Sequence, residues 1–181
     1  MTPLDQQFDA QQFANGYVLV DGEQMHAESP ENFLIPPPVI KCHVRAGQFV
    51  ELRIDSPRFS VHEDAPQKCE CPSCNGEITK PVLRHAQPET LEALPTENVP
   101  SRGWGEDFWV QVQGRSGEFL RGVVDNSLVE ARLHGITRGT AIVFGEAHIL
   151  AVHDSHRQEL VSEMTVAELK ELAQWIASQR R

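Results

Sequence analysis

Alternating apolar and polar residues through the middle of the chain predict a fold rich in β-strands. In the segment GQFVELRID, Val50, Leu52 and Ile54 fall on one face of an extended chain, and Glu51 and Arg53 fall on the other. Similar segments follow at residues 107–113, 118–124, 139–144 and 147–153. A Gly-Arg-Ser-Gly turn separates the first two of these segments, which favours a β-hairpin and hence an antiparallel sheet.

The first forty residues carry weaker signals. Leu4, Phe8 and Phe13 recur at roughly helical spacing and predict a short amphipathic helix that ends at an Asn-Gly pair. The segment GYVLVDGE predicts a brief strand followed by an Asp-Gly turn. The proline-rich residues 28–39 predict an extended chain, because proline is excluded from helix interiors.

Residues 165–179 predict an amphipathic C-terminal helix. Thr165 and Glu168 have the spacing of a reciprocal capping box, in which each side chain bonds the backbone N–H of the other residue. Apolar residues then repeat at three- and four-residue steps: Val166, Leu169, Leu172 and Ile176. We expect this stripe to pack on the sheet as a lid, in preference to binding a partner. The pattern as a whole predicts an α+β fold that is mainly antiparallel β.

Length and charge limit the classes of function. The 181 residues are enough for a single domain spanning 1–181, and 40% of them are hydrophobic, which suffices for a core. The formal net charge of −10 repels phosphate backbones and anionic membranes, and it favours a basic protein partner. The sequence shows neither an apolar run of bilayer length nor the features of a secretory signal. We therefore expect a cytoplasmic protein that binds neither membranes nor nucleic acid.

Three of the four cysteines lie within six positions, at Cys69, Cys71 and Cys74. Clustered thiols in a reducing compartment are typical of metal sites, and a Cys-x-x-Cys turn can grip one tetrahedral ion. The hexapeptide CPSCNG resembles the zinc-knuckle half-site of zinc ribbons and rubredoxins, although a second Cys-x-x-Cys pair is missing from the chain. Cys69 is the natural third ligand, and we predict His85 as the fourth. Cys42 and His62 are the rival candidates for that fourth position.

The cysteines fall in a long segment rich in Pro and Glu, which we interpret as an inserted zinc module at residues 57–103. A site rich in thiolates is typical of structural zinc, because thiolates weaken the Lewis acidity that hydrolysis needs. A redox role is less favoured, since no helix pattern follows Cys74 to lower the pKa of a thiol. No other motif predicts chemistry. His148, His153, Asp154 and His156 match no helical metal-binding spacing, so we interpret them as part of a solvated loop.

The β-segments together resemble an uncharacterised bacterial family, domain of unknown function two-three-one-four. The resemblance spans residues 28–153 apart from the cysteine module. It rests on motifs at residues 47–49, 105–109, 122–126 and 139–149. Gln48, Phe108 and Thr140 depart from the family pattern. The resemblance implies a small, strongly bent antiparallel sheet or partial barrel, and it implies no reaction.

The function that these observations favour is a zinc-binding, non-enzymatic accessory or protein-interaction domain. The first alternative is an enzyme that uses the cysteine cluster, either a thiol oxidoreductase or a zinc hydrolase. The second is an RNA-binding barrel, which the negative charge disfavours. The metal ligands predicted for the favoured function are Cys69, Cys71, Cys74 and His85, with structural zinc as the cofactor.

Overall fold

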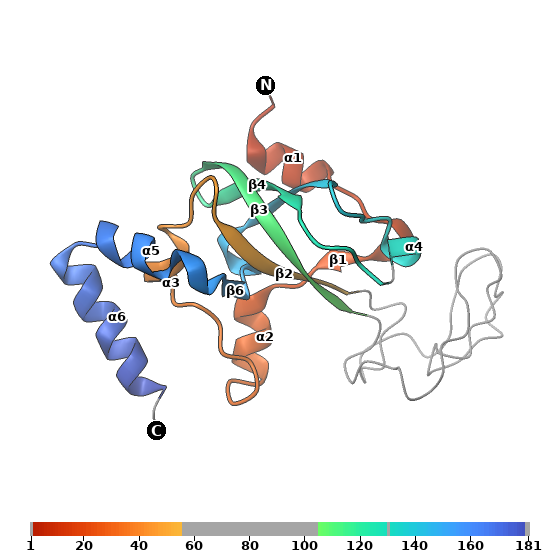
Figure 1. Ribbon diagram of the computed structural model, residues 1–181. Coiled ribbons are helices and arrows are strands. Elements are labelled where there is room, and N and C mark those ends of the chain that lie inside the picture. Colours follow the sequence, from red (N-terminus) through yellow and green to blue (C-terminus); the bar gives the residue numbers. More distant parts are fainter. Residues whose placement is uncertain (1, 56–104, 130, 180–181) are drawn as a thin grey trace.

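The protein is an α+β fold built on an antiparallel, barrel-like sheet (Figure 1). The computed structural model describes residues 2–55, 105–129 and 131–179. The strands are β1 (Val18–Leu19), β2 (Phe49–Asp55), β3 (Glu106–Ser116), β4 (Phe119–Val124), β5 (Ala141–Gly145) and β6 (Ala151–Val152). They pair in the order β1-β2-β3-β4-β5, and β6 returns to pair with β2. This return of the chain nearly closes the barrel.

The helices are short except for the last. They are α1 (Leu4–Ala10), α2 (Gly22–Glu28), α3 (Pro38–Lys41), α4 (Ala131–His134), α5 (Arg157–Glu163) and α6 (Val166–Ser178). Three-residue 3-10 helices lie at η1 (Ala14–Gly16), η5 (Glu146–His148) and η6 (Asp154–His156). Among the described residues, no helix has the length and apolar character to cross a bilayer.

The predicted alternation of β2 and β3 is confirmed. Val50, Leu52 and Ile54 of β2 are all fully buried, while the residues between them face outward. Leu52 lies opposite Phe108 of β3, which is also fully buried. Each such side chain contributes about 1.5–3 kcal/mol by leaving water, so this inward face is a large part of what stabilises the barrel.

The β3–β4 hairpin is also confirmed, and its two strands approach very closely at one point. Gly117 turns the chain with a φ of +61°, a conformation that glycine adopts without strain. Further along β4, a Cβ atom on Gly122 would lie 2.4 Å from Val110 Cγ1 and 2.6 Å from the Gln111 carbonyl oxygen. Glycine at residue 122 is therefore required by packing rather than by its backbone angles.

The Asp-Gly turn predicted at residues 21–22 was wrong, because Asp21 caps a helix. Its carboxylate accepts hydrogen bonds from the backbone N–H groups of Glu23 and Gln24, at 2.9 and 3.0 Å, which starts α2. The strand predicted at residues 147–153 is likewise mostly absent: η5 occupies its first two residues, and only Ala151 and Val152 pair with β2.

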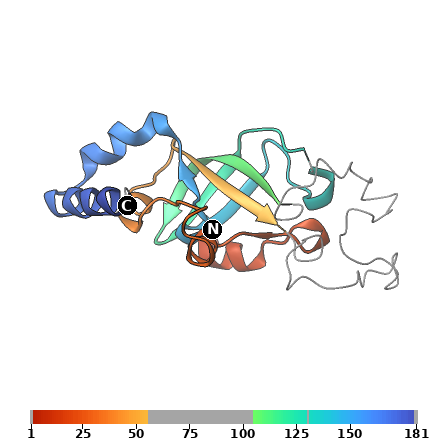
Figure 2. The ribbon, with the colours of Figure 1, turned by 90° about the horizontal axis from the view of Figure 1, so that it is seen from below.

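The C-terminal helix forms with the predicted capping box, but it is not a lid on the sheet. Both views show α5 and α6 extending to one side of the barrel (Figure 1 and Figure 2). No residue of α6 is buried, and α6 packs chiefly against α3. Val166, Leu169 and Ile176 remain 71%, 37% and 41% exposed. The intervening helix α5 holds α6 away from the sheet, so its apolar stripe stays largely in solvent.

Candidate metal centre

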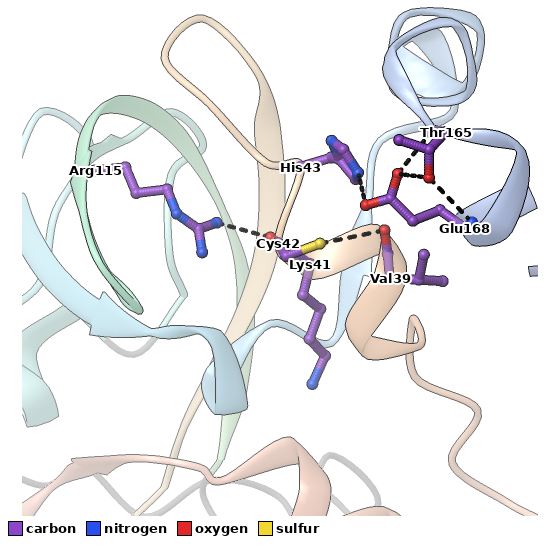
Figure 3. A network of polar contacts seen from close by, with 7 residues as sticks. All are labelled: Val39, Lys41, Cys42, His43, Arg115, Thr165 and Glu168. Atoms are coloured by element: carbon purple, nitrogen blue, oxygen red, sulfur yellow. Dashed lines mark hydrogen bonds and ion pairs between the residues drawn. The ribbon is translucent and has the colours of Figure 1, made fainter. Parts of the chain in front are cut away.

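Three side chains that can bind a metal ion meet where α3 ends and α6 begins (Figure 3). Cys42 is the C-cap of α3, His43 follows it, and Glu168 lies in the first turn of α6. One potential ligand atom from each residue lies within 4.8 Å of the other two. We refer to these three residues as the Cys42 cluster. Within the part of the chain that the structure describes, no other group of Cys, His, Asp and Glu side chains comes together in this way.

The Glu168 carboxylate is held in place through both oxygens. Oε2 accepts hydrogen bonds from the Thr165 backbone N–H at 2.6 Å and from its hydroxyl at 2.7 Å. Oε1 lies 3.0 Å from Nε2 of His43. The bonds from Thr165, followed by the one from His43, lower the pKa of Glu168 to about 2. The group is therefore an oriented carboxylate at neutral pH, with one oxygen directed at the neighbouring histidine.

The Cys42 thiol lies beside this carboxylate but donates elsewhere. Its Sγ donates to the Val39 carbonyl oxygen at 3.5 Å. Partial burial, and next the charge of Glu168, raise the pKa of the Cys42 thiol above its ordinary value. A reactive thiol has the opposite property, a lowered pKa. A bound cation would reverse the effect of Glu168, because metal ions bind the thiolate.

The three donor types suit a zinc ion, which binds Cys, His and carboxylate side chains. Zinc bonds of about 2.0–2.3 Å in a tetrahedron place ligand atoms roughly 3.3–3.6 Å apart. His43 Nε2 and Glu168 Oε1 are 3.0 Å apart, at hydrogen-bond distance, and they would separate slightly to hold an ion. An ion would replace the thiol proton and the proton shared between imidazole and carboxylate. Three protein ligands leave a fourth position for water or another donor.

Arg115 of β3 holds the backbone on both sides of the two ligands from α3. Its guanidinium donates to the carbonyl oxygens of Lys41 at 2.9 Å and Val44 at 3.3 Å, and it pairs with Glu146 of η5. These bonds connect the Cys42 cluster to the barrel (Figure 3). Support of this kind fixes the direction of ligand side chains, which strengthens metal binding.

The sequence and the structure emphasise different donors. Cys69, Cys71, Cys74, His85 and His62, with the whole module at 57–103, lie outside the described residues.

The sequence favours Cys42 only as a rival fourth ligand for that module, and the structure surrounds it with His43 and Glu168 instead. Neither of these two residues is predicted as a ligand. The sequence indicates the capping role of Glu168, but no signal in it connects Glu168 with His43, 125 positions away.

His153 and His156 of the predicted loop pack against aromatic rings. His153 is exposed, as expected for a loop, with its ring 5.2 Å from Trp109. His156 stacks on Phe49 with ring centroids 5.8 Å apart, and its side chain is only 14% exposed, so the expected solvated loop was wrong for this residue. These rings form an aromatic patch on the outer face of β2 and β3.

His148 is packed inside η5, contrary to the expected solvated loop. Its Nδ1 lies 3.1 Å from the Gly145 backbone nitrogen and 3.3 Å from the Gly145 carbonyl oxygen. Its ring is 5.1 Å from the ring of Phe8 in α1. Burial lowers the pKa of His148, and the positive charge of Lys41 lowers it further, against opposing effects of Asp21 and the Gly145 backbone. His148 is therefore a structural residue.

Comparisons with known proteins found no match: the chain matches no family model, no curated protein and no solved structure. The functional interpretation therefore rests on the geometry described above. The resemblance to the uncharacterised bacterial family stays a prediction.

Proposed function

We propose that the chain is a zinc-binding, non-enzymatic domain that binds a protein partner. The observation that supports this most directly is the Cys42 cluster, in which donors from two separate elements converge. The module with Cys69, Cys71, Cys74 and His85 is a second, structural zinc site in this proposal. Its Cys-x-x-Cys turn is the sequence feature that supports it.

Zinc at the Cys42 cluster would fix the direction of α6. Glu168 is the ligand from α6, whereas Cys42 and His43 belong to the end of α3, which Arg115 ties to the barrel. In the structure, the hydrogen bond between His43 and Glu168 connects the end of α3 to α6. No side chain of α6 is buried, so few other contacts fix the direction of this helix. Metal coordination would therefore add the strongest link between α6 and the rest of the fold.

The charge of the ligand set supports a structural role. A thiolate and a carboxylate together donate two negative charges to the ion, and this weakens its ability to activate water. Three protein ligands with an open fourth position are also the arrangement of catalytic zinc, so the assay below separates the two roles. The exposed apolar side chains Val166, Leu169 and Ile176 then provide a surface that a protein partner can bury. The net charge of −10 favours a basic partner.

Metal analysis of the purified full chain tests the zinc sites. We expect about two equivalents of zinc in the wild type, about one in Cys42→Ser and in Glu168→Gln, and about one in Cys71→Ser. His85→Ala should weaken binding at the cysteine module alone. Gln174→Ala is the control, because it changes an exposed polar side chain of the same helix and should leave the zinc content unchanged. Zinc content that is unaffected by Cys42→Ser and Glu168→Gln would refute the site at the Cys42 cluster.

Hydrogen exchange and an esterase assay separate the structural role from catalysis. Zinc should slow amide exchange in α6 of the wild type, and it should have no effect on α6 in Glu168→Gln. Zinc-dependent hydrolysis of p-nitrophenyl acetate that disappears in Cys42→Ser would instead favour the zinc hydrolase. Circular dichroism of each variant establishes that the fold is retained.

A further inference from the structure

A small cavity opens on the outer face of the sheet, away from the Cys42 cluster. Its volume is about 180 Å³. The charged residues that line it are Glu51 and Arg53 of β2 and Asp107 of β3, and its apolar walls include Met25, Leu34 and Leu150. Outward-facing residues of two paired strands thus form one side, and the chain around α2 forms the other.

The charges in the cavity do not cancel. Arg53 Nη1 donates to Asp107 Oδ1 at 2.8 Å, and its side chain is only 14% exposed, so this arginine is already paired. The Glu51 carboxylate makes no ion pair or side-chain hydrogen bond within the described residues. One arginine against two carboxylates leaves a net charge of −1.

The surroundings of Glu51 disfavour an unpaired negative charge. Partial burial, and next the charge of Asp107, raise the pKa of Glu51 above its ordinary value. A cation placed in the cavity would relieve both effects. The unpaired carboxyl group is thus an acceptor without a donor, in a space that has apolar walls.

An aromatic side chain borders the same place. Trp109 of β3 lies directly opposite Glu51 in the antiparallel register, so both side chains point outward as neighbours. Trp109 is partly exposed and belongs to the aromatic patch with Phe49 and His153. An indole ring beside a carboxylate favours a cation, because the ring face carries partial negative charge.

We propose that this cavity binds a lysine side chain of the protein partner. The ammonium group pairs with Glu51, and the aliphatic stem packs against Met25, Leu34 and Leu150. We assign lysine because its unbranched stem and compact ammonium group need less room than the planar guanidinium of arginine in a cavity of about 180 Å³. This inference rests on the proposed function, since it assigns a recognition element to the basic partner proposed above.

NMR titration of the zinc-loaded, isotope-labelled full chain tests the inference. The probe is Nα-acetyl-lysine methylamide, and Nα-acetyl-norleucine methylamide is the uncharged control. We expect saturable shifts at the amide of Glu51 and the indole of Trp109 with lysine, and at least fivefold weaker binding of norleucine. Glu51→Gln should weaken lysine binding at least fivefold. Glu118→Gln, which removes an exposed carboxylate from the β3–β4 turn, should leave it unchanged.

Three results would overturn the lysine assignment: absence of saturable binding, equal binding of norleucine, or equal effects of the two Glu→Gln variants. Zinc content measured on the same samples keeps the two proposals separate. Lysine binding by a protein that holds no zinc would refute the zinc proposal and leave the cavity assignment standing. Zinc in the wild type without lysine binding would refute the cavity assignment alone.

Discussion

Gly122→Ala is the substitution that most directly tests the packing of the barrel. Gly122 sits in β4 opposite Val112 of β3. The added methyl group would lie 2.4 Å from Val110 Cγ1 and 2.6 Å from the Gln111 carbonyl oxygen. The second contact is with backbone in the same strand pair, so no side-chain rotation relieves it.

The geometry sets the size of the effect. Ordinary contacts begin near 3.4 Å, so the methyl group must move about 0.8–1.0 Å away from both atoms. Val110 is fully buried and cannot yield without disturbing the core. Overpacking of this kind costs about 1–3 kcal/mol, and we expect the upper end of that range because a backbone atom is involved. A loss of about 3 kcal/mol lowers the unfolding midpoint by roughly 6–12 °C.

Urea and thermal denaturation measure this loss, and Gly114→Ala is the matched control. Gly114 lies in β3, a methyl group added there would meet nothing within 4 Å, and its φ is not positive. We expect Gly114→Ala to change the free energy of unfolding by less than about 0.5 kcal/mol, or to stabilise the fold slightly by restricting the unfolded chain. A loss below about 1 kcal/mol for Gly122→Ala, or equal losses for both variants, would refute the packing argument.

Three further predictions concern parts of the fold around the barrel. Arg115→Met removes the donor to two part-buried carbonyls at the end of α3, so urea unfolding should show a loss of about 2–4 kcal/mol; a loss below about 1 kcal/mol would contradict the contacts. His148→Gln tests a pH effect. Because the folded-state pKa of this histidine is lowered from 6.5, its stabilising contribution is present above pH 6.5 and is lost as the pH falls through the folded-state value. The stability difference between wild type and variant should therefore shrink in acid, and a difference independent of pH would count against this. Ile176→Ala in α6 should cost less than about 1 kcal/mol, whereas Leu52→Ala in the core should cost about 2–5 kcal/mol; similar costs would mean that α6 is packed after all.

The strands were predictable because their signal is local. A two-residue period places Val50, Leu52 and Ile54 on one face whatever the rest of the chain does, and burying that face stabilises the sheet. Short elements lack such a signal. Asp21-Gly22 has the composition of a turn, but the Asp21 cap and the contacts of α2 with the chain around Leu150 favour a helix there.

The packing of α6 could not be predicted from its amphipathic stripe. The period of Val166, Leu169 and Ile176 establishes a helix with one apolar face, but it does not say what covers that face. The answer depends on α5, whose start is tied to β2 by Gln48. The amide of Gln48 donates to Glu159 at 3.3 Å. That contact joins residues 111 positions apart, so no local pattern reveals it.

The Cys42 cluster could not be predicted for a related reason. The capping box explains why a glutamate stands three residues after a threonine, so the sequence gives no reason to expect a further partner for Glu168. A carboxylate has two oxygens, however, and the cap uses only Oε2, which leaves Oε1 free to meet His43 from α3. The local bonds from Thr165 hold the carboxylate in one orientation and lower its pKa to about 2. A side chain that caps a helix can thus make a long-range contact at the same time.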